Sequence, residues 1–314
     1  MAQQLVENLG KPLNISYIGA GRSPGSLVES DLLLLILQKV SGRKVVINKK
    51  WREAELILVY PYISGQILFR LRWIIAAVVK KCFKVGDCTK LFRWLLGVAN
   101  VPVLFVSHEN LDRPFWWKMF GNFLVQSNIP RLTFWPKQID SRGCRFPYWY
   151  NYVMWDEYPR VSYYPRFGRF YKISELMEPL KCDSSRKDLA VLISSHLDHP
   201  RGALVKAFRE QKDIDIYGGA GLAFQGSKLD LMKDYKYAFC VENSVGFGYD
   251  TEKLPEAWVA GCVPLGVYLN PFSDFNPAVV DINPSDPTSY ARVPLLKTEP
   301  SLDEIEAYVK KEFF

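Results

Sequence analysis

Residues 235–264 read YKYAFCVENSVGFGYDTEKLPEAWVAGCVP and combine an expected strand, a polar loop and the start of a helix. The apolar run 237–241 is typical of a strand that is buried on both faces. Two glycines then interrupt the pattern, and we expect Thr251 to be the N-cap of a helix whose first turn contains Pro255. A buried strand that leads into a helix is the repeating unit of α/β proteins with parallel sheets.

Polar side chains gather at this junction between strand and helix. Asn243, Glu252 and Lys253 supply a carboxamide, an acid and an amine within a short stretch. Open α/β sheets bind ligands beyond the carboxyl ends of their strands, where free N–H groups at a helix start favour phosphate. A polar turn without a ligand would explain the glycines and Thr251, but it would not explain this combination of groups. The stretch therefore predicts a ligand site.

The alternation of strands and helices continues from this stretch towards both ends of the chain. In the first half we expect strands at 14–18, 44–47, 56–62 and 101–107 and helices at 27–40 and 66–83. In the second half we expect strands at 189–194, 214–217, 237–241 and 263–267 and helices at 202–211, from 252 and from 301. Ser301 and Glu304 predict a capping box at the start of the last helix. The pattern predicts two α/β domains, 1–168 and 169–314, with the last helix in the second domain.

The composition narrows the class of protein. Of the 314 residues, 48% are apolar, which is enough for two hydrophobic cores. The six cysteines form no C-x-x-C pair, so we expect no disulfide framework and a reducing compartment. The three histidines lack the spacing of a metal site, and we expect no bound metal. The net charge of +7 suits anionic partners such as a nucleotide diphosphate or an acidic membrane surface.

No apolar stretch of the sequence is long enough to span a membrane. The N-terminal MAQQLVENLGKPLN has no basic start with an apolar run, and the longest apolar runs, 32–37 and 73–79, are far too short. We therefore expect a cytoplasmic enzyme without a membrane anchor. The expected helix 66–83 has a basic face, which either lies in solvent or docks peripherally on the inner membrane.

Several motifs of the central stretch resemble those of a known family. ENS at 242–244, Tyr249, TEK at 251–253 and AGCVP at 260–264 resemble the donor-site signature of the α-1,3/4-fucosyltransferases, glycosyltransferase family 10, in their bacterial form. The resemblance is strongest over 188–281. It implies the arrangement called GT-B, in which two Rossmann-like domains face a central cleft. The first domain would bind the acceptor and the second would bind GDP-fucose.

The resemblance also implies roles for residues in the second domain. Arg201 matches an arginine that reaches the donor diphosphate, although an arginine at a helix start can also simply be solvated. Lys253 would hold the same diphosphate, and the guanidinium and ammonium groups suit this task because both donate to phosphate oxygens. Glu252 would accept hydrogen bonds from ribose hydroxyls, and Asn243 and Tyr249 would contact the donor.

The catalytic base that the resemblance implies lies in the first domain. Glu109 follows the expected strand 101–107 and matches the position of the family's base, whereas a surface or capping acid is the alternative for this residue. Asp112, three residues further on, is a second candidate. Because GDP is a good leaving group, the reaction needs one base and cations for the diphosphate, with no cofactor or metal.

The implied reaction is the inverting transfer of L-fucose from GDP-fucose to a hydroxyl of an N-acetylglucosamine-containing glycan, in α-1,3 or α-1,4 linkage. N-Acetyllactosamine or a lipopolysaccharide O-chain would be the acceptor, and no nucleic acid would be a partner. The stretch 115–171 is rich in aromatic residues, whose faces stack on sugars. Candidates for the acceptor site are Trp116, Trp117, Tyr148 and Trp149.

Other functions remain open at this point. The glycines of GAGRSPG at 19–25 follow a strand and would suit an NADP-dependent oxidoreductase, but Pro24 stands where the helix should begin. Asp213 and Asp215 form a D-x-D, which we interpret as surface acids at a strand start. A different sugar-nucleotide transferase and a non-catalytic glycan-binding module are further alternatives. Binding of GDP, NADPH or glycans would separate them.

Overall fold

The computed structural model of the chain describes residues 10–19, 31–48, 50–61, 75–76, 86–98, 100–112, 116–160, 168–183, 185–198, 201–210, 213–265, 271–279 and 293–314. Most of the expected helix 66–83 and residues 20–25 of the glycine motif lie outside these ranges. Within them, no helix combines the length and the apolar character that crossing a bilayer requires.

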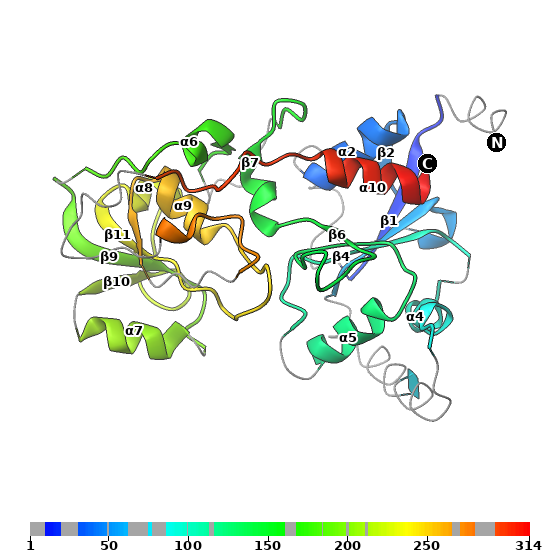
Figure 1. Cartoon of the computed structure of the whole chain (residues 1–314), viewed down its shortest axis with the longest axis horizontal. Helices are drawn as coiled ribbons and strands as arrows, with labels where there is room; N and C mark the ends of the chain where they lie inside the picture. The colour runs from blue at the N-terminus through cyan, green and yellow to red at the C-terminus, as the bar shows by residue number, and fades with distance from the viewer. Residues whose placement is uncertain are drawn as a thin grey trace. The chain divides into compact units, whose positions relative to one another are not determined.

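The chain forms two compact units, each with its own parallel sheet (Figure 1). Unit 1 consists of Met1–Phe146 together with Ser301–Phe314, and unit 2 consists of Pro147–Pro300. This arrangement confirms the expected α/β fold with two parallel sheets.

Unit 1 is built on a six-stranded sheet with the order β2-β1-β3-β4-β5-β6, in which all neighbours are parallel. Every residue of β3 and β4 is buried, as expected for inner strands with helices on both faces. The strands are β1 (Leu13–Ile18), β2 (Val45–Ile47), β3 (Leu56–Val59), β4 (Val103–Val106), β5 (Arg131–Thr133) and β6 (Cys144–Arg145).

Helix α2 of unit 1 begins and ends at residues that satisfy its backbone groups. Asp31 caps α2 by accepting a hydrogen bond from the backbone N–H of Leu33, and Gly42 ends the helix with a positive φ of 66°. The helices of this unit are α2 (Leu32–Ser41), the 3-10 helix η2 (Trp51–Glu53), α4 (Thr89–Leu96), α5 (Trp116–Val125) and α10 (Asp303–Phe313).

The last helix, α10, packs against α2 and β6 of unit 1 rather than within the second domain, where we expected it (Figure 1). Ile305 and Val309 bury the apolar side of the helix. The boundary also differs, because unit 2 begins at Pro147 and the prediction placed the division at 168/169. The expected capping box is not formed: the N-cap is Leu302, and Ser301 accepts instead from the N–H of Asp303.

Unit 2 is built on a four-stranded parallel sheet with the order β10-β9-β11-β12. Its strands are β9 (Lys187–Ile193), β10 (Ile214–Tyr217), β11 (Tyr235–Phe239) and β12 (Val263–Leu265). The helices α7 (Arg201–Arg209), α8 (Lys228–Met232) and α9 (Lys253–Val259) connect them. The remaining elements are η4 (Tyr148–Tyr152), the paired strands β7 (Val153–Met154) and β8 (Tyr171–Lys172), α6 (Ile173–Met177) and η5 (Pro277–Val279).

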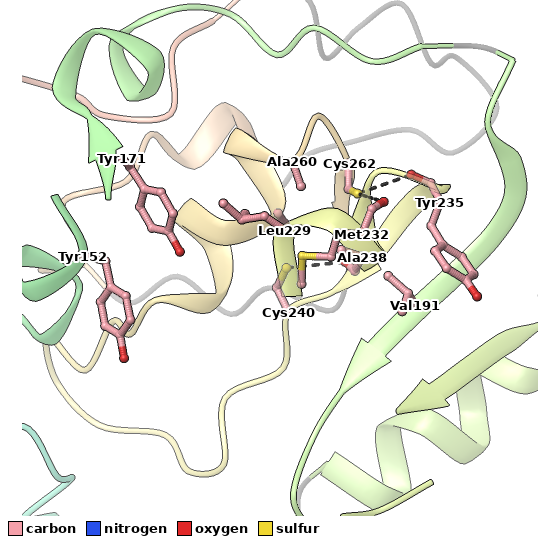
Figure 2. Packing of buried hydrophobic residues seen from close by; sticks show 11 residues of the cluster. Tyr152, Tyr171, Val191, Leu229, Met232, Tyr235, Ala238, Cys240, Ala260 and Cys262 are labelled. Atoms are coloured by element: carbon pink, nitrogen blue, oxygen red, sulfur yellow. Dashed lines mark hydrogen bonds between the residues drawn. The ribbon is translucent and has the colours of Figure 1, made fainter. Parts of the chain in front are cut away.

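The core of unit 2 lies between β11 and the two helices α8 and α9. Figure 2 shows Leu229 and Met232 of α8 packed with Ala238 of β11 and with Ala260, which follows α9. The single S–H of Cys262 lies between the backbone carbonyls of Met232 and Tyr235, both within hydrogen-bond distance, inside this cluster. The described cysteines are free thiols, namely Cys88, Cys144, Cys182, Cys240 and Cys262.

Candidate functional site

The site lies where the direction of winding changes in the sheet of unit 2. The chain passes from β9 to β10 on one side and then returns to β11 on the other side of β9. Neighbouring parallel strands whose connections leave in opposite directions create an opening beyond their carboxyl ends, which is the usual ligand position in such sheets. Both the segment after β9 and the loop from β11 to α9 begin at this point.

Glu242 organises the loop between β11 and α9. Its Oε1 atom accepts hydrogen bonds from the backbone N–H of Thr251 at 3.1 Å and from the Thr251 hydroxyl at 2.5 Å. Its Oε2 atom lies 2.8 Å from Nζ of Lys253, which also donates to Oγ1 of Thr251 at 2.8 Å. We expected Thr251 to be the N-cap of α9, but that position is occupied by Glu252. The hydroxyl instead bridges an acid and a lysine.

Lys253 is positively charged at neutral pH despite being largely buried. Its side chain is 20% exposed. Burial and the nearby Arg201 lower the pKa of Lys253, but Glu242 and Glu252 outweigh them, so the pKa is raised above its ordinary value. The ammonium therefore offers a fixed positive charge beyond the carboxyl end of β11.

Glu252 is ionised because two lysines lie close to its carboxylate. Its Oε1 atom lies 3.8 Å from Nζ of Lys253 and 3.6 Å from Nζ of Lys228. Burial alone would raise the pKa of this carboxyl, but the two lysines lower it to about 2. Glu252 is thus a hydrogen-bond acceptor at any physiological pH.

A second buried ion pair lies behind Glu252. Nζ of Lys228, in α8, is 3.1 Å from both carboxylate oxygens of Glu256, in α9. The Glu256 side chain is 2% exposed, and burial raises its pKa to about 7 against the opposing effect of Lys228. Neither Lys228 nor Glu256 was predicted from the sequence, and Glu242 had no expected role. An acid inside the otherwise apolar helix segment LPEAWV was the available signal for Glu256.

Arg201 joins the ends of β9 and β11. Its guanidinium donates to the Ser194 hydroxyl, to the carbonyl of His196 at 3.0 Å, and to the carbonyl of Val241 through Nε at 3.3 Å and Nη2 at 3.2 Å. The residue is only 3% exposed. The structure thus rules out the alternative of a solvated arginine. It places the charge close enough to Lys253 to affect that residue's pKa.

Asn243 and Tyr249 come together in the loop after β11. The Tyr249 hydroxyl donates to Oδ1 of Asn243 at 3.3 Å, and the Ser244 hydroxyl donates to the same atom. Tyr249 is buried, whereas Val245 and Phe247 between these residues are exposed. All five residues that the sequence places in the donor site therefore lie in unit 2, at the starts of α7 and α9 or in the loop after β11.

Glu109 lies in unit 1, just beyond the carboxyl end of β4, as expected. Its backbone is fixed by Ser107, whose hydroxyl accepts from the N–H of Glu109 at 3.2 Å and donates to its carbonyl at 2.9 Å. The carboxylate of Asp112, the competing candidate, accepts from Nε1 of Trp135 at 3.3 Å through both oxygens. Asp112 thus has a structural partner in this unit.

One of the four aromatic residues that we expected in the acceptor site, Trp149, is not available to bind a sugar. Trp149 is fully buried; its Nε1 donates to Oδ2 of Asp274 at 2.9 Å and its ring packs on Phe275. Tyr148 is half-buried, and its hydroxyl accepts from the Tyr152 hydroxyl at 2.7 Å. Trp116 and Trp117 belong to α5, and their side chains lie outside the described residues.

The D-x-D residues have no metal-binding arrangement. Asp213 is exposed, and Oδ2 of Asp215 accepts from the Tyr235 hydroxyl at 2.7 Å. Among the residues that the structure describes, no three His, Cys, Asp or Glu side chains cluster in a way that would hold a metal ion.

Comparisons with known proteins agree with this geometry. Residues 183–284, which contain β9 to β12, match the family model of glycosyltransferase family 10 (fucosyltransferase), C-terminal part. A crystal structure of an α1,3-fucosyltransferase is similar over 96% of this chain and 89% of that chain, with a TM-score of 0.56 and 16% identity. A structure of α1,3-fucosyltransferase with GDP-fucose gives a TM-score of 0.55 and 16% identity over 96% of this chain and 90% of the other. The fold is thus that of the GT-B fucosyltransferase structures.

Proposed function

We propose that this protein transfers L-fucose from GDP-fucose to a hydroxyl of an N-acetylglucosamine-containing glycan, because residues 183–284 match the family model of glycosyltransferase family 10 (fucosyltransferase). The observation that carries the proposal is the charged cluster of Glu242, Glu252 and Lys253 between β11 and the start of α9, inside the matched segment. The linkage would be α-1,3 or α-1,4, and N-acetyllactosamine or a lipopolysaccharide O-chain would be the acceptor.

Lys253 and Arg201 would bind the diphosphate of the donor. An ammonium group has three N–H donors, and Glu242 and Thr251 accept two of those of Lys253, so a phosphate oxygen would accept the third. Glu252 would accept hydrogen bonds from the ribose hydroxyls. Asn243 and Tyr249 would contact the donor from the loop after β11. These roles use groups that are already ionised and held in place before the ligand arrives.

Glu109 would act as the general base. It would take the proton of the acceptor hydroxyl while that oxygen bonds to the anomeric carbon of fucose from the opposite side of the leaving group. The bond between this carbon and the diphosphate oxygen breaks, and its electron pair leaves with GDP. Lys253 and Arg201 would stabilise the negative charge that develops there. A glycosidase needs a second carboxyl to protonate its leaving group, whereas GDP leaves as a stable anion.

The experiment that tests this proposal is a transfer assay with GDP-fucose and N-acetyllactosamine, followed by mass spectrometry and by NMR to identify the fucosylated hydroxyl. A lipopolysaccharide O-chain is the second acceptor. We expect a product one fucose heavier and an equal amount of GDP. Saturable binding of NADPH without binding of GDP would favour the oxidoreductase, and glycan binding without transfer would favour the binding module.

We also propose that the protein is a bacterial enzyme of the cytoplasm and that its basic segment 66–83 contacts the inner membrane peripherally. Of the residues in that segment, the structure describes only 75 and 76. Sedimentation with vesicles of anionic and of neutral lipids tests the membrane contact. Binding to anionic vesicles that salt abolishes would support it, because surface attraction of basic residues is screened by ions.

We expect the transfer rate to be independent of divalent metal ions. Two cationic side chains supply the charge that a metal provides in other nucleotide-sugar enzymes, and the described acids around the site are paired with lysines. The measurement is the rate of transfer with EDTA and with added manganese, and most of the rate should survive the chelator. Complete loss with EDTA and recovery with manganese would contradict this expectation.

A further inference from the structure

The buried residue Lys228 contacts two carboxylates that belong to successive turns of one helix start. Its Nζ lies 3.1 Å from Oε1 of Glu256 and 3.6 Å from Oε1 of Glu252. The exposed fractions of the three side chains are 10% for Lys228, 2% for Glu256 and 12% for Glu252. In Figure 1, α8 and α9, which carry these residues, lie beside each other on the sheet of unit 2.

Stability alone does not explain this arrangement. A buried ion pair contributes little more to folding than apolar residues of the same volume, because removing both charges from water offsets their attraction. Glu252 and Glu256 are also one helical turn apart, where like charges repel each other. Without a shared cation, one of two such buried carboxyls would bind a proton.

The surroundings of the two carboxyls favour the charged form of Glu252 over that of Glu256. The two lysines lower the pKa of Glu252 to about 2, and burial raises the pKa of Glu256 to about 7. Lys253, the other cation near Glu252, is already 2.8 Å from Glu242. Lys228 is therefore a second cation, beside Lys253, that stabilises the negative charge of the Glu252 carboxylate.

The backbone around Lys228 fixes the position of its side chain. Ser227 is the N-cap of α8, and its hydroxyl accepts from the backbone N–H of Asp230 at 3.1 Å. The next residue after Lys228, Leu229, is anchored in the core of unit 2 with Met232 (Figure 2). The backbone of Lys228 is thus fixed by a capped helix start, and the Glu256 carboxylate holds its ammonium.

We propose that Lys228 is a positioning residue that holds the Glu252 carboxylate ionised and oriented for the ribose hydroxyls of the nucleotide, with Glu256 holding Lys228 in place. The inference rests on the proposed function, because Glu252 is assigned there to the ribose. Lys228 itself touches no substrate in this scheme. It determines how strongly the site distinguishes a nucleotide with ribose hydroxyls from one without them.

The test compares the affinities of GDP and 2′,3′-dideoxy-GDP by isothermal titration calorimetry of the full chain. Hydrogen bonds to a charged acceptor should give the unchanged protein a preference for GDP of roughly 10- to 100-fold. In Lys228→Met we expect the preference to fall to about threefold or less, while the affinity for dideoxy-GDP stays nearly constant. Lys228→Arg keeps the charge and should restore most of the preference.

Lys233→Met is the matched control, because Lys233 is at the end of the same helix and pairs with Asp230 at the surface. It should leave the preference for GDP unchanged. Where Lys228→Met does not fold, the double variant Lys228→Met/Glu256→Leu removes the buried pair and leaves Glu252 with Lys253, 3.8 Å away, as its partner. It should also lack the preference.

A Lys228→Met protein, or the double variant, that keeps the full preference for GDP would overturn the inference and leave Lys228 a purely structural residue. Equal affinity of the unchanged protein for both nucleotides would overturn it as well. An unchanged protein that binds neither nucleotide would instead contradict the proposed function, so the two failures are distinguishable.

Discussion

Replacing Glu109 with glutamine is expected to lower kcat for fucose transfer by about 10²–10⁴. Glutamine keeps the shape of the side chain but cannot accept the proton of the acceptor hydroxyl. The loss should appear in kcat rather than in the affinity for GDP, because the missing interaction belongs to the transition state. The measurement is steady-state transfer with saturating GDP-fucose, together with GDP calorimetry and thermal unfolding of the variant.

Asp112→Asn is the matched control for Glu109→Gln. The Asp112 carboxylate accepts from the indole N–H of Trp135, so an amide at this position should affect the stability of unit 1 more than the rate of transfer. A Glu109→Gln enzyme with nearly unchanged kcat, beside an inactive but folded Asp112→Asn enzyme, would transfer the role of the base to Asp112.

Replacing Lys253 with alanine should weaken GDP binding by roughly 2–3 kcal/mol, or about 30- to 150-fold in Kd. The variant loses a charge-assisted bond to the diphosphate, and it leaves the Glu242 carboxylate without its nearest cation, so that this carboxylate repels the phosphate. Calorimetry with GDP gives the change in Kd, and circular dichroism checks the fold.

Lys206→Ala provides the comparison for Lys253→Ala, because Lys206 lies on the exposed side of α7 in the same unit. It removes the same net charge and should leave the Kd for GDP within about twofold of the original. A folded Lys253→Ala protein with unchanged GDP affinity would remove Lys253 from the proposed site.

The first four strands of the unit 1 sheet and all four strands of the unit 2 sheet were predictable from local patterns. The expected strand 214–217 is β10 as observed, and the others differ from the observed strands by only a few residues at their ends. Apolar runs of four or five residues between turn signals mark strands that are buried on both faces. The region of the donor-site residues was predictable from the same elements, because Asn243 follows the apolar run after β11, whereas Arg201 and Lys253 begin the helices α7 and α9 that come after β9 and β11.

The features that the sequence did not reveal depend on contacts between distant segments. The strands β5 to β8 have two or three residues each, which is too short for a periodic pattern, and they lie in the aromatic stretch. The apolar stripe of α10 predicts that the helix is packed but not that its partner is α2. The approach of Lys228 to Glu252 likewise follows from the packing of α8 on α9, which no local pattern encodes.

The return of Ser301–Phe314 to unit 1 affects the order in which the protein can fold during synthesis. All of Pro147–Pro300 leaves the ribosome before the helix that completes unit 1. Unit 2 is a continuous segment and can fold as soon as it has emerged. In unit 1, the surface of α2 and β6 that α10 covers stays exposed until the residues of α10 have been translated. The first part of the chain to emerge is thus the last to be finished, and chaperone binding to nascent chains should be strongest at that surface.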